Sequence, residues 1–165
     1  MVWSTIHKVC VSLLDESDCD KVHEILSGVI KTHSRRCLEE TTETGVTALH
    51  FAALSEYPYI LEILMEYGAD LNVKNLNGET PLHWACASGN FHPVLVFVNF
   101  GVGLLEDRNG DTPLHWAIEG GKIQIAKFLA PRYQSLNQKI NKSGISPLAL
   151  AQRKNLGSDI FGSTQ

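Results

Sequence analysis

The sequence GETPLHWAC at residues 78–86 returns 32 residues later as GDTPLHWAI at residues 110–118. Two weaker copies flank this pair, GVTALH at residues 45–50 and GISPLA at residues 144–149. The four leading glycines lie 33, 32 and 34 residues apart, and self-similarity at such a period is typical of a repeat architecture. The chain is therefore predicted to be a stack of similar units.

Each copy of the motif carries its own folding signals, which the second copy illustrates. Asn77-Gly78 is a turn dipeptide that favours positive backbone angles, so the unit should open with a tight, hairpin-like turn. Thr80 can cap a helix that begins at Pro81, where a missing amide hydrogen costs nothing. Gly89 is expected to end this helix, and a second, more apolar helix follows. Each unit is predicted to be turn, helix, loop, helix.

The motif and its period resemble the ankyrin repeat family from residue 44 to about residue 154. The resemblance implies an all-α fold, an ankyrin-repeat solenoid of helix-loop-helix units with hairpin-like turns. One domain over residues 1–165 is expected. Its segments are a divergent N-terminal cap at 1–43, repeats at 44–76, 77–108 and 109–142, and a truncated C-terminal cap at 143–165.

The two ends of the stack depart from the motif. Residues 1–43 lack Thr-Pro-Leu-His, but residues 6–14 and 22–30 each carry apolar side chains at helical spacing. We interpret them as a capping repeat, because the end of a solenoid buries one face and exposes the other. Near the other end, Gly157-Ser158 interrupts a polar segment, so the last repeat is expected to have little or no second helix.

Single substitutions within the repeats predict local irregularities. Glu56 replaces the glycine that ends the first helix, and Ala149 replaces the motif histidine, so the second and fifth units are expected to be distorted. Pro58 and Pro93 are expected in the first turn of their second helices, where proline is tolerated.

Three histidines recur in register, each three residues after a threonine. The pairs are Thr47 with His50, Thr80 with His83, and Thr112 with His115. Zinc would need its imidazole ligands within about 4 Å of one another, whereas equivalent positions on packed helices lie roughly 8 to 10 Å apart. We therefore predict a structural role, with a hydroxyl-to-imidazole hydrogen bond in each pair and no metal site.

One aromatic residue follows each histidine, at Phe51, Trp84 and Trp116. This position lies on the helix face opposite the small apolar residues, so the rings should point away from the core. The resemblance implies that this face and the turn tips form the concave surface where ankyrin proteins bind partners, with the rings as anchors. The alternative is that the rings only cover neighbouring turns.

We expect partner contacts on the first helices from Phe51, Trp84, Ser88, Trp116 and Glu119. The turn tips would supply a polar rim, formed by Thr44, Val46, Leu76, Asn77, Glu79, Arg108, Asn109 and Asp111.

Asp70-Leu71-Asn72, with Leu64 eight residues before the asparagine, resembles the loop that an asparaginyl hydroxylase modifies in ankyrin proteins. Asn72 is the candidate for that hydroxylation. In the alternative interpretation, the side chain of Asn72 ties the turn with hydrogen bonds.

Composition limits the classes of partner and compartment. Residues 1–107 carry 15 acidic and 6 basic side chains and residues 108–165 carry 3 and 8, which gives a net charge of -4. An acidic majority argues against general binding to nucleic acid. No apolar segment approaches the roughly 20 residues of a membrane span, and no signal peptide is recognised. Four irregularly spaced cysteines indicate free thiols, so an intracellular protein of cytoplasm or nucleus is expected.

Motifs of common enzyme classes are absent, including Gly-x-Ser-x-Gly, His-Glu-x-x-His and a complete P-loop. No enzyme activity and no cofactor are therefore expected. We predict a free-standing ankyrin adaptor or inhibitor that binds another protein and is monomeric when free. Two alternatives stay open: a small inhibitor of a transcription factor or kinase, similar to inhibitors of NF-kappaB, and an ankyrin region of a larger enzyme or channel.

Overall fold

The computed structural model describes residues 4–57 and 59–162. Within them the chain is helical and contains no strand. The elements are α1 (Thr5–Ser12), α2 (Cys19–His33), η1 (Arg35–Glu39), α3 (Ala48–Ala52), α4 (Tyr59–Glu66), α5 (Pro81–Ser88), α6 (Phe91–Asn99), α7 (Pro113–Glu119), α8 (Ile123–Leu129), η2 (Gln134–Leu136), α9 (Pro147–Arg153) and α10 (Gly157–Phe161).

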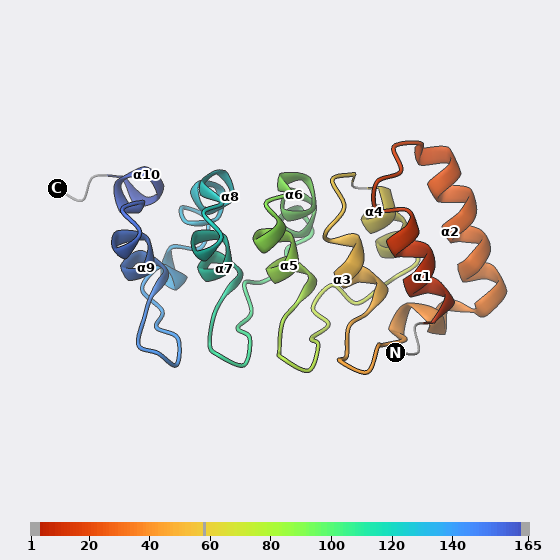
Figure 1. The fold of residues 1–165 in the computed structure, drawn as a ribbon, viewed down its shortest axis with the longest axis horizontal. Helices are drawn as coiled ribbons and strands as arrows, with labels where there is room; N and C mark the ends of the chain where they lie inside the picture. The colour runs from red at the N-terminus through yellow and green to blue at the C-terminus, as the bar shows by residue number, and fades with distance from the viewer. Residues whose placement is uncertain (1–3, 58, 163–165) are drawn as a thin grey trace.

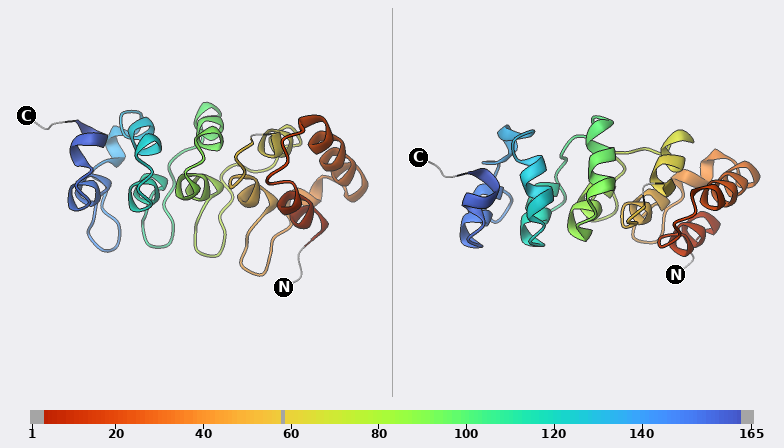
Figure 2. Two further views of the ribbon diagram at one scale, coloured as in Figure 1. Left: turned by 45° about the horizontal axis from the view of Figure 1, so that its top comes forward. Right: turned by 90° about the horizontal axis from the view of Figure 1, so that it is seen from above.

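The helices form pairs that stack side by side along the long axis of the molecule (Figure 1). The first helices of the units, α1, α3, α5, α7 and α9, form one row in which each helix contacts the next. The second helices, α2, α4, α6, α8 and α10, form the other row. The turns that lead into the first helices project from one side of the stack (Figures 1 and 2). This arrangement confirms the predicted solenoid of helix-loop-helix units.

The core lies between the two rows and contains the apolar residues that the period predicts. Its largest fully buried side chains come from both rows and include Leu49, Leu82 and Leu114 of the first helices and Leu64, Phe97 and Leu129 of the second. Motif signals act where expected: α5 and α7 begin at proline, and Gly89 ends α5 in the left-handed conformation with φ 90°. Pro93 is within the first turn of α6, whereas Pro58 lies outside the described residues.

Each turn is closed by the side chain three residues before its glycine. The side-chain oxygens of Asn75, Asp107 and Asn141 each accept hydrogen bonds from two backbone N–H groups of their own turn, at 2.7 to 3.0 Å. Adjacent turns are joined by backbone hydrogen bonds from Leu76 to Thr44, from Arg108 to Asn77 and from Lys142 to Asn109. The turns therefore form a continuous, rigid edge along the stack.

The two ends differ in part from the prediction. Both apolar stripes of residues 1–43 form helices, α1 and α2, and the 3-10 helix η1 was not foreseen. At the other end Gly157, which was expected to interrupt the chain, is instead the first residue of α10. This short helix contacts α8 and α9 and buries Ile160, so the last unit has a second helix of one and a half turns.

The second unit is irregular, as Glu56 led us to expect. Its first helix α3 has 5 residues, whereas α5 has 8. After α3 the buried hydroxyl of Ser55 donates to the carbonyl of Leu14, at 2.7 Å, and so joins this unit to the N-terminal helices. Within residues 4–57 and 59–162, no helix combines the length and apolar character that a membrane crossing requires.

Candidate functional site

Each motif histidine joins its own helix to the next unit. Nδ1 of His83 accepts the backbone N–H of Thr80 at 3.0 Å and lies 2.9 Å from its hydroxyl oxygen. Nε2 lies 3.1 Å from the backbone carbonyl of Asp111, in the following turn. Since a backbone N–H only donates and a carbonyl only accepts, the proton sits on Nε2. His50 and His115 have the same contacts, with the carbonyls of Glu79 and Ile145 respectively.

The N-terminal cap contains a fourth histidine of this kind, which sequence reasoning missed. His7 Nδ1 is hydrogen-bonded to the hydroxyl of Ser4, and its Nε2 donates to the carbonyl of Val46 at 3.0 Å. The signal was present in the sequence, because Ser4-Thr5-Ile6-His7 is a degenerate form of Thr-x-Leu-His. It was hidden by the absence of a preceding turn glycine.

Burial controls the charge of these histidines. Desolvation lowers the pKa of His7, His50 and His83 from the ordinary value of 6.5, and the hydrogen bond to a backbone carbonyl opposes this effect only in part. These three rings are therefore neutral near pH 7. In the part of the chain that the structure describes, no group of three histidine, cysteine or acidic side chains could hold a metal ion.

The aromatic residue of each unit lies against the histidine of the unit before it. The rings meet edge to face, with centroid distances of 5.9 Å for Phe51 and His7, 5.3 Å for Trp84 and His50, and 5.5 Å for Trp116 and His83. All three rings are half-buried. They therefore cover the neighbouring unit and still present part of their surface on the row of first helices.

Carboxylates of the turns fix both indole rings. Trp84 Nε1 donates to Glu79 at 2.9 Å, and Trp116 Nε1 donates to Asp107 at 3.2 Å. Asp111 accepts a hydrogen bond from the side chain of Asn141, at 2.7 Å. Glu79 and Asp111, which were predicted as rim residues, are thus half-buried and engaged within the stack, whereas Arg108 is exposed at its turn tip. The role of Asp107 was missed, because its partner Trp116 lies nine residues away.

The other predicted contact residues differ in their exposure. Ser88 is half-buried at the end of α5, where its hydroxyl donates to the carbonyl of Ala85 at 2.9 Å. Glu119 is exposed and forms an ion pair with Lys154 at 3.0 Å. Of the remaining turn-tip residues, Thr44, Leu76, Asn77 and Asn109 are exposed and Val46 is buried.

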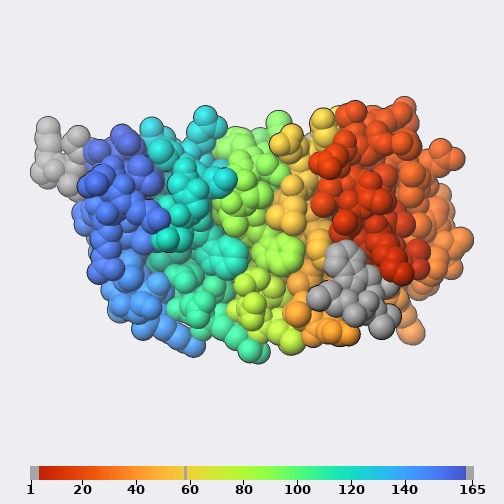
Figure 3. Space-filling view, viewed as in Figure 1, coloured from red at the N-terminus to blue at the C-terminus, as the bar shows by residue number. Residues whose placement is uncertain are grey.

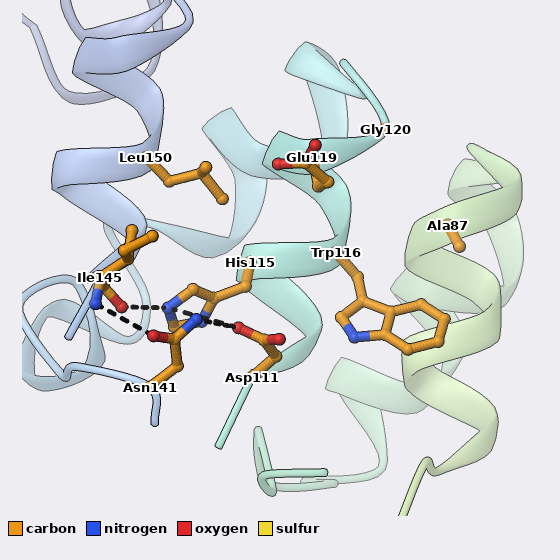
Figure 4. A pocket seen from close by; sticks show the side chains of 9 residues that line it. All are labelled: Ala87, Asp111, His115, Trp116, Glu119, Gly120, Asn141, Ile145 and Leu150. Atoms are coloured by element: carbon orange, nitrogen blue, oxygen red, sulfur yellow. Dashed lines mark hydrogen bonds and ion pairs between the residues drawn. The ribbon is translucent and has the colours of Figure 1, made fainter. Parts of the chain in front are cut away.

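A pocket lies between α7 and α9 (Figure 4). Figure 3 shows the surface of the molecule from the side of Figure 1, with the units following one another along its length. The pocket has a volume of about 430 Å³ and brings together three predicted contact residues, Asp111, Trp116 and Glu119. His115 lies at its floor, and Ile145 and Leu150 form the wall contributed by the last unit (Figure 4).

Asn72 is exposed in the loop after α4. Its backbone N–H donates to the carboxylate of Asp70 at 2.9 Å, so the tie in this turn comes from Asp70. The side-chain carboxamide of Asn72 makes no hydrogen bond to any of the residues that the structure describes.

Comparison with known proteins agrees with this architecture. A family model described as "Ankyrin repeats (3 copies)" matches residues 7–96, 49–143 and 94–160. The ADP-ribosylation factor GTPase-activating protein AGD2 of Arabidopsis thaliana is 44% identical over 57 residues, which are 34% of this chain and 7% of that protein. The human NAD-capped RNA hydrolase NUDT12 is 39% identical over 77 residues, 47% of this chain and 16% of that protein.

The NF-kappa-B inhibitor alpha of Gallus gallus is 42% identical over 50 residues, 30% of this chain and 16% of the inhibitor. The chain thus spans less than a fifth of the length of each of these relatives. The family match covers the stacked helix pairs and the motif turns alike. The chain belongs to the ankyrin repeat family.

Proposed function

We propose that this protein is a non-catalytic module that binds a partner protein on its first-helix face, which we define as the exposed sides of α3, α5, α7 and α9 with the turns before them. Ankyrin repeats are in general protein-interaction modules. Within that class we propose an adaptor or inhibitor that acts inside the cell, in cytoplasm or nucleus, as a monomer when free. The proposal of an intracellular site is supported by four free cysteines.

The observation that carries the proposal is the row of half-buried rings, Phe51, Trp84 and Trp116. Large aromatic side chains held in one orientation make strong contacts, because little conformational entropy is lost when a partner covers them. Trp84 and Trp116 meet this condition, since each indole is fixed by a carboxylate and by the preceding histidine. The rigid turns beside them support an interface that needs no rearrangement.

Affinity capture from cell extract, followed by calorimetry with the captured protein, tests this face. Trp84→Ala or Trp116→Ala should each weaken binding by about 2 kcal/mol or more. Arg108→Glu, at the exposed rim, should mainly change the association rate and its salt dependence. Circular dichroism should show that each variant retains its helices.

The matched control is Phe100→Ala, which removes a ring that is 66% exposed at the end of α6, in the row of second helices. It should leave binding unchanged. Full-strength binding by the double variant Trp84→Ala with Trp116→Ala would rule out the first-helix face.

We further propose Asn72 as a site of asparaginyl hydroxylation. The proposal is supported by its exposure and by a carboxamide that the described residues do not engage. Mass spectrometry of the protein isolated from cells should find one added oxygen on the peptide that contains Asn72. Its absence after co-expression with an asparaginyl hydroxylase would contradict the assignment.

A further inference from the structure

The series of rings that cover the histidines ends before the last unit. Phe51 covers His7, Trp84 covers His50 and Trp116 covers His83. The next position in register, which would cover His115, is Leu150. A leucine has no ring to extend across the gap between α9 and α7, and the pocket of about 430 Å³ lies at this place (Figure 4).

Two carboxylates give this pocket its charge. Residues 108–165 hold only 3 acidic side chains against 8 basic ones, and two of the three, Asp111 and Glu119, line the pocket. One oxygen of Asp111 accepts from Asn141, and one oxygen of Glu119 pairs with Lys154. The second oxygen of each carboxylate makes no hydrogen bond to any residue in the described ranges, so both can accept a donor from outside.

We propose that this pocket receives an arginine side chain of the partner protein. The inference rests on the proposed function and names the chemistry that the first-helix face would recognise. A guanidinium is planar, so it can occupy the place of the absent ring between Trp116 and Leu150. Its N–H donors can engage the free oxygen of Asp111, and its positive charge is attracted by Glu119 on the same rim of the pocket.

Arginine fits this site better than the other candidate side chains. A lysine ammonium is a compact, strongly hydrated charge and would not fill a flat site beside an indole. An aromatic side chain would fill it but would leave the second oxygen of the half-buried Asp111 carboxylate without a hydrogen-bond donor. Lys154 does not prevent binding, because a third of its side chain is exposed and a surface ion pair of this kind is weak and exchangeable.

The test uses the whole protein and short peptides as probes. Acetyl-Gly-Arg-Gly-amide is titrated into ¹⁵N-labelled protein while the indole N–H resonance of Trp116 is followed by NMR. The same peptide with citrulline, lysine or tryptophan in place of arginine provides the comparison, and citrulline has the shape of arginine without its charge. We expect a saturable shift with a dissociation constant near the millimolar range, and about tenfold weaker binding of the citrulline peptide.

Variants of the pocket sharpen the result. Leu150→Trp restores the ring found at this position in α5 and α7, so it should fill the pocket and abolish the shift. Asp111→Asn keeps the shape and the contact with Asn141, and should weaken binding about tenfold. If Leu150→Trp does not fold, Glu119→Gln takes its place: like Asp111→Asn, it removes a negative charge from the pocket and should weaken binding of the arginine peptide. Glu62→Gln, exposed on α4, is the control and should have no effect.

Three outcomes would overturn the proposal: no saturable shift, equal binding of the arginine and citrulline peptides, or tighter binding of the tryptophan peptide. This titration needs no partner, so its failure can be told apart from failure of the proposed function. If the peptide assay fails while Trp84→Ala still weakens partner binding, only the assignment of the pocket is lost.

Discussion

At the scale of single residues, the motif histidine performs two tasks with its two nitrogens. Nδ1 accepts from the threonine at the start of its own helix, and Nε2–H donates to a carbonyl of the next turn, as for His83 with Thr80 and Asp111. The first task needs the neutral ring, because a protonated Nδ1 would face the N–H of the threonine. Low pH should therefore destabilise the folded protein.

The sign of this effect follows from the lowered pKa values of His7, His50 and His83. Below about pH 6.5 the histidines of the unfolded chain take up protons, whereas those of the folded chain stay neutral. The free energy of unfolding therefore decreases as the pH is lowered toward the pKa values of these histidines in the folded protein. Each histidine can contribute up to about 1.4 kcal/mol per pH unit in that interval. Urea midpoints should change little from about pH 7.5 to pH 7 and should then decrease as the pH is lowered to about 5.5.

His83→Gln provides the control for this prediction. It removes one of the three imidazoles whose pKa is lowered, so the pH dependence of the midpoint should become shallower while the midpoint at neutral pH also falls. A stability that does not change between neutral and mildly acidic pH would contradict the assignment of neutral, buried histidines.

At the scale of the helices, the two rows have different tasks. The first helices are short and carry small residues on their inner side, Ala85 and Cys86 in α5 for example, so that neighbouring units approach closely. The second helices carry larger side chains, such as Phe97 of α6. The leucine of the motif is the main core residue of each first helix, and Leu82 and Leu114 have no exposed surface.

Leu82→Ala should therefore lower the free energy of unfolding by about 2 to 5 kcal/mol, because the cavity lies between units that cannot collapse freely. Leu76→Ala, on an exposed turn-tip leucine, is the matched control and should change stability by less than about 0.5 kcal/mol. Thermal and urea denaturation followed by circular dichroism measures both. An unchanged melting temperature for Leu82→Ala would show that α5 does not pack as described.

At the scale of the whole molecule, the main contacts between the described helices join neighbouring units, and three kinds of link make these contacts. Core side chains, the histidine bonds and the backbone bonds between turns all cross each boundary between the motif units. Strong coupling between neighbouring repeats makes a short array unfold as one body.

We therefore expect a single unfolding transition for the whole chain. Helix content measured by circular dichroism and indole fluorescence should give the same urea midpoint. His83→Ala removes the hydrogen bond between the third and fourth units and should lower the free energy of unfolding by about 1 to 3 kcal/mol. The midpoints measured by circular dichroism and by fluorescence should decrease together. Separate midpoints in the unsubstituted protein would show instead that the units unfold independently.

The sequence by itself determined the local structure and the family. Turn dipeptides, the threonine and proline of the motif and the apolar period act within a few residues, so they identify a helix without knowledge of its neighbours. The bond between Thr80 and His83 could be predicted for the same reason, since it spans three residues. The helices η1 and α10 were not predicted. Where the local signal was degenerate, as at Ser4 and His7, the role of the histidine was missed although its helix was predicted.

Only the tertiary structure decided what each side chain meets in the next unit. The acceptors of Nε2 in His50, His83 and His115 lie 28 to 30 residues away. The engagement of Asp111 by Asn141 and the pocket beside Leu150 depend likewise on how one repeat is placed against the following one. A repeat sequence specifies its own turn and helices, whereas the surface that a partner meets is created where two repeats join.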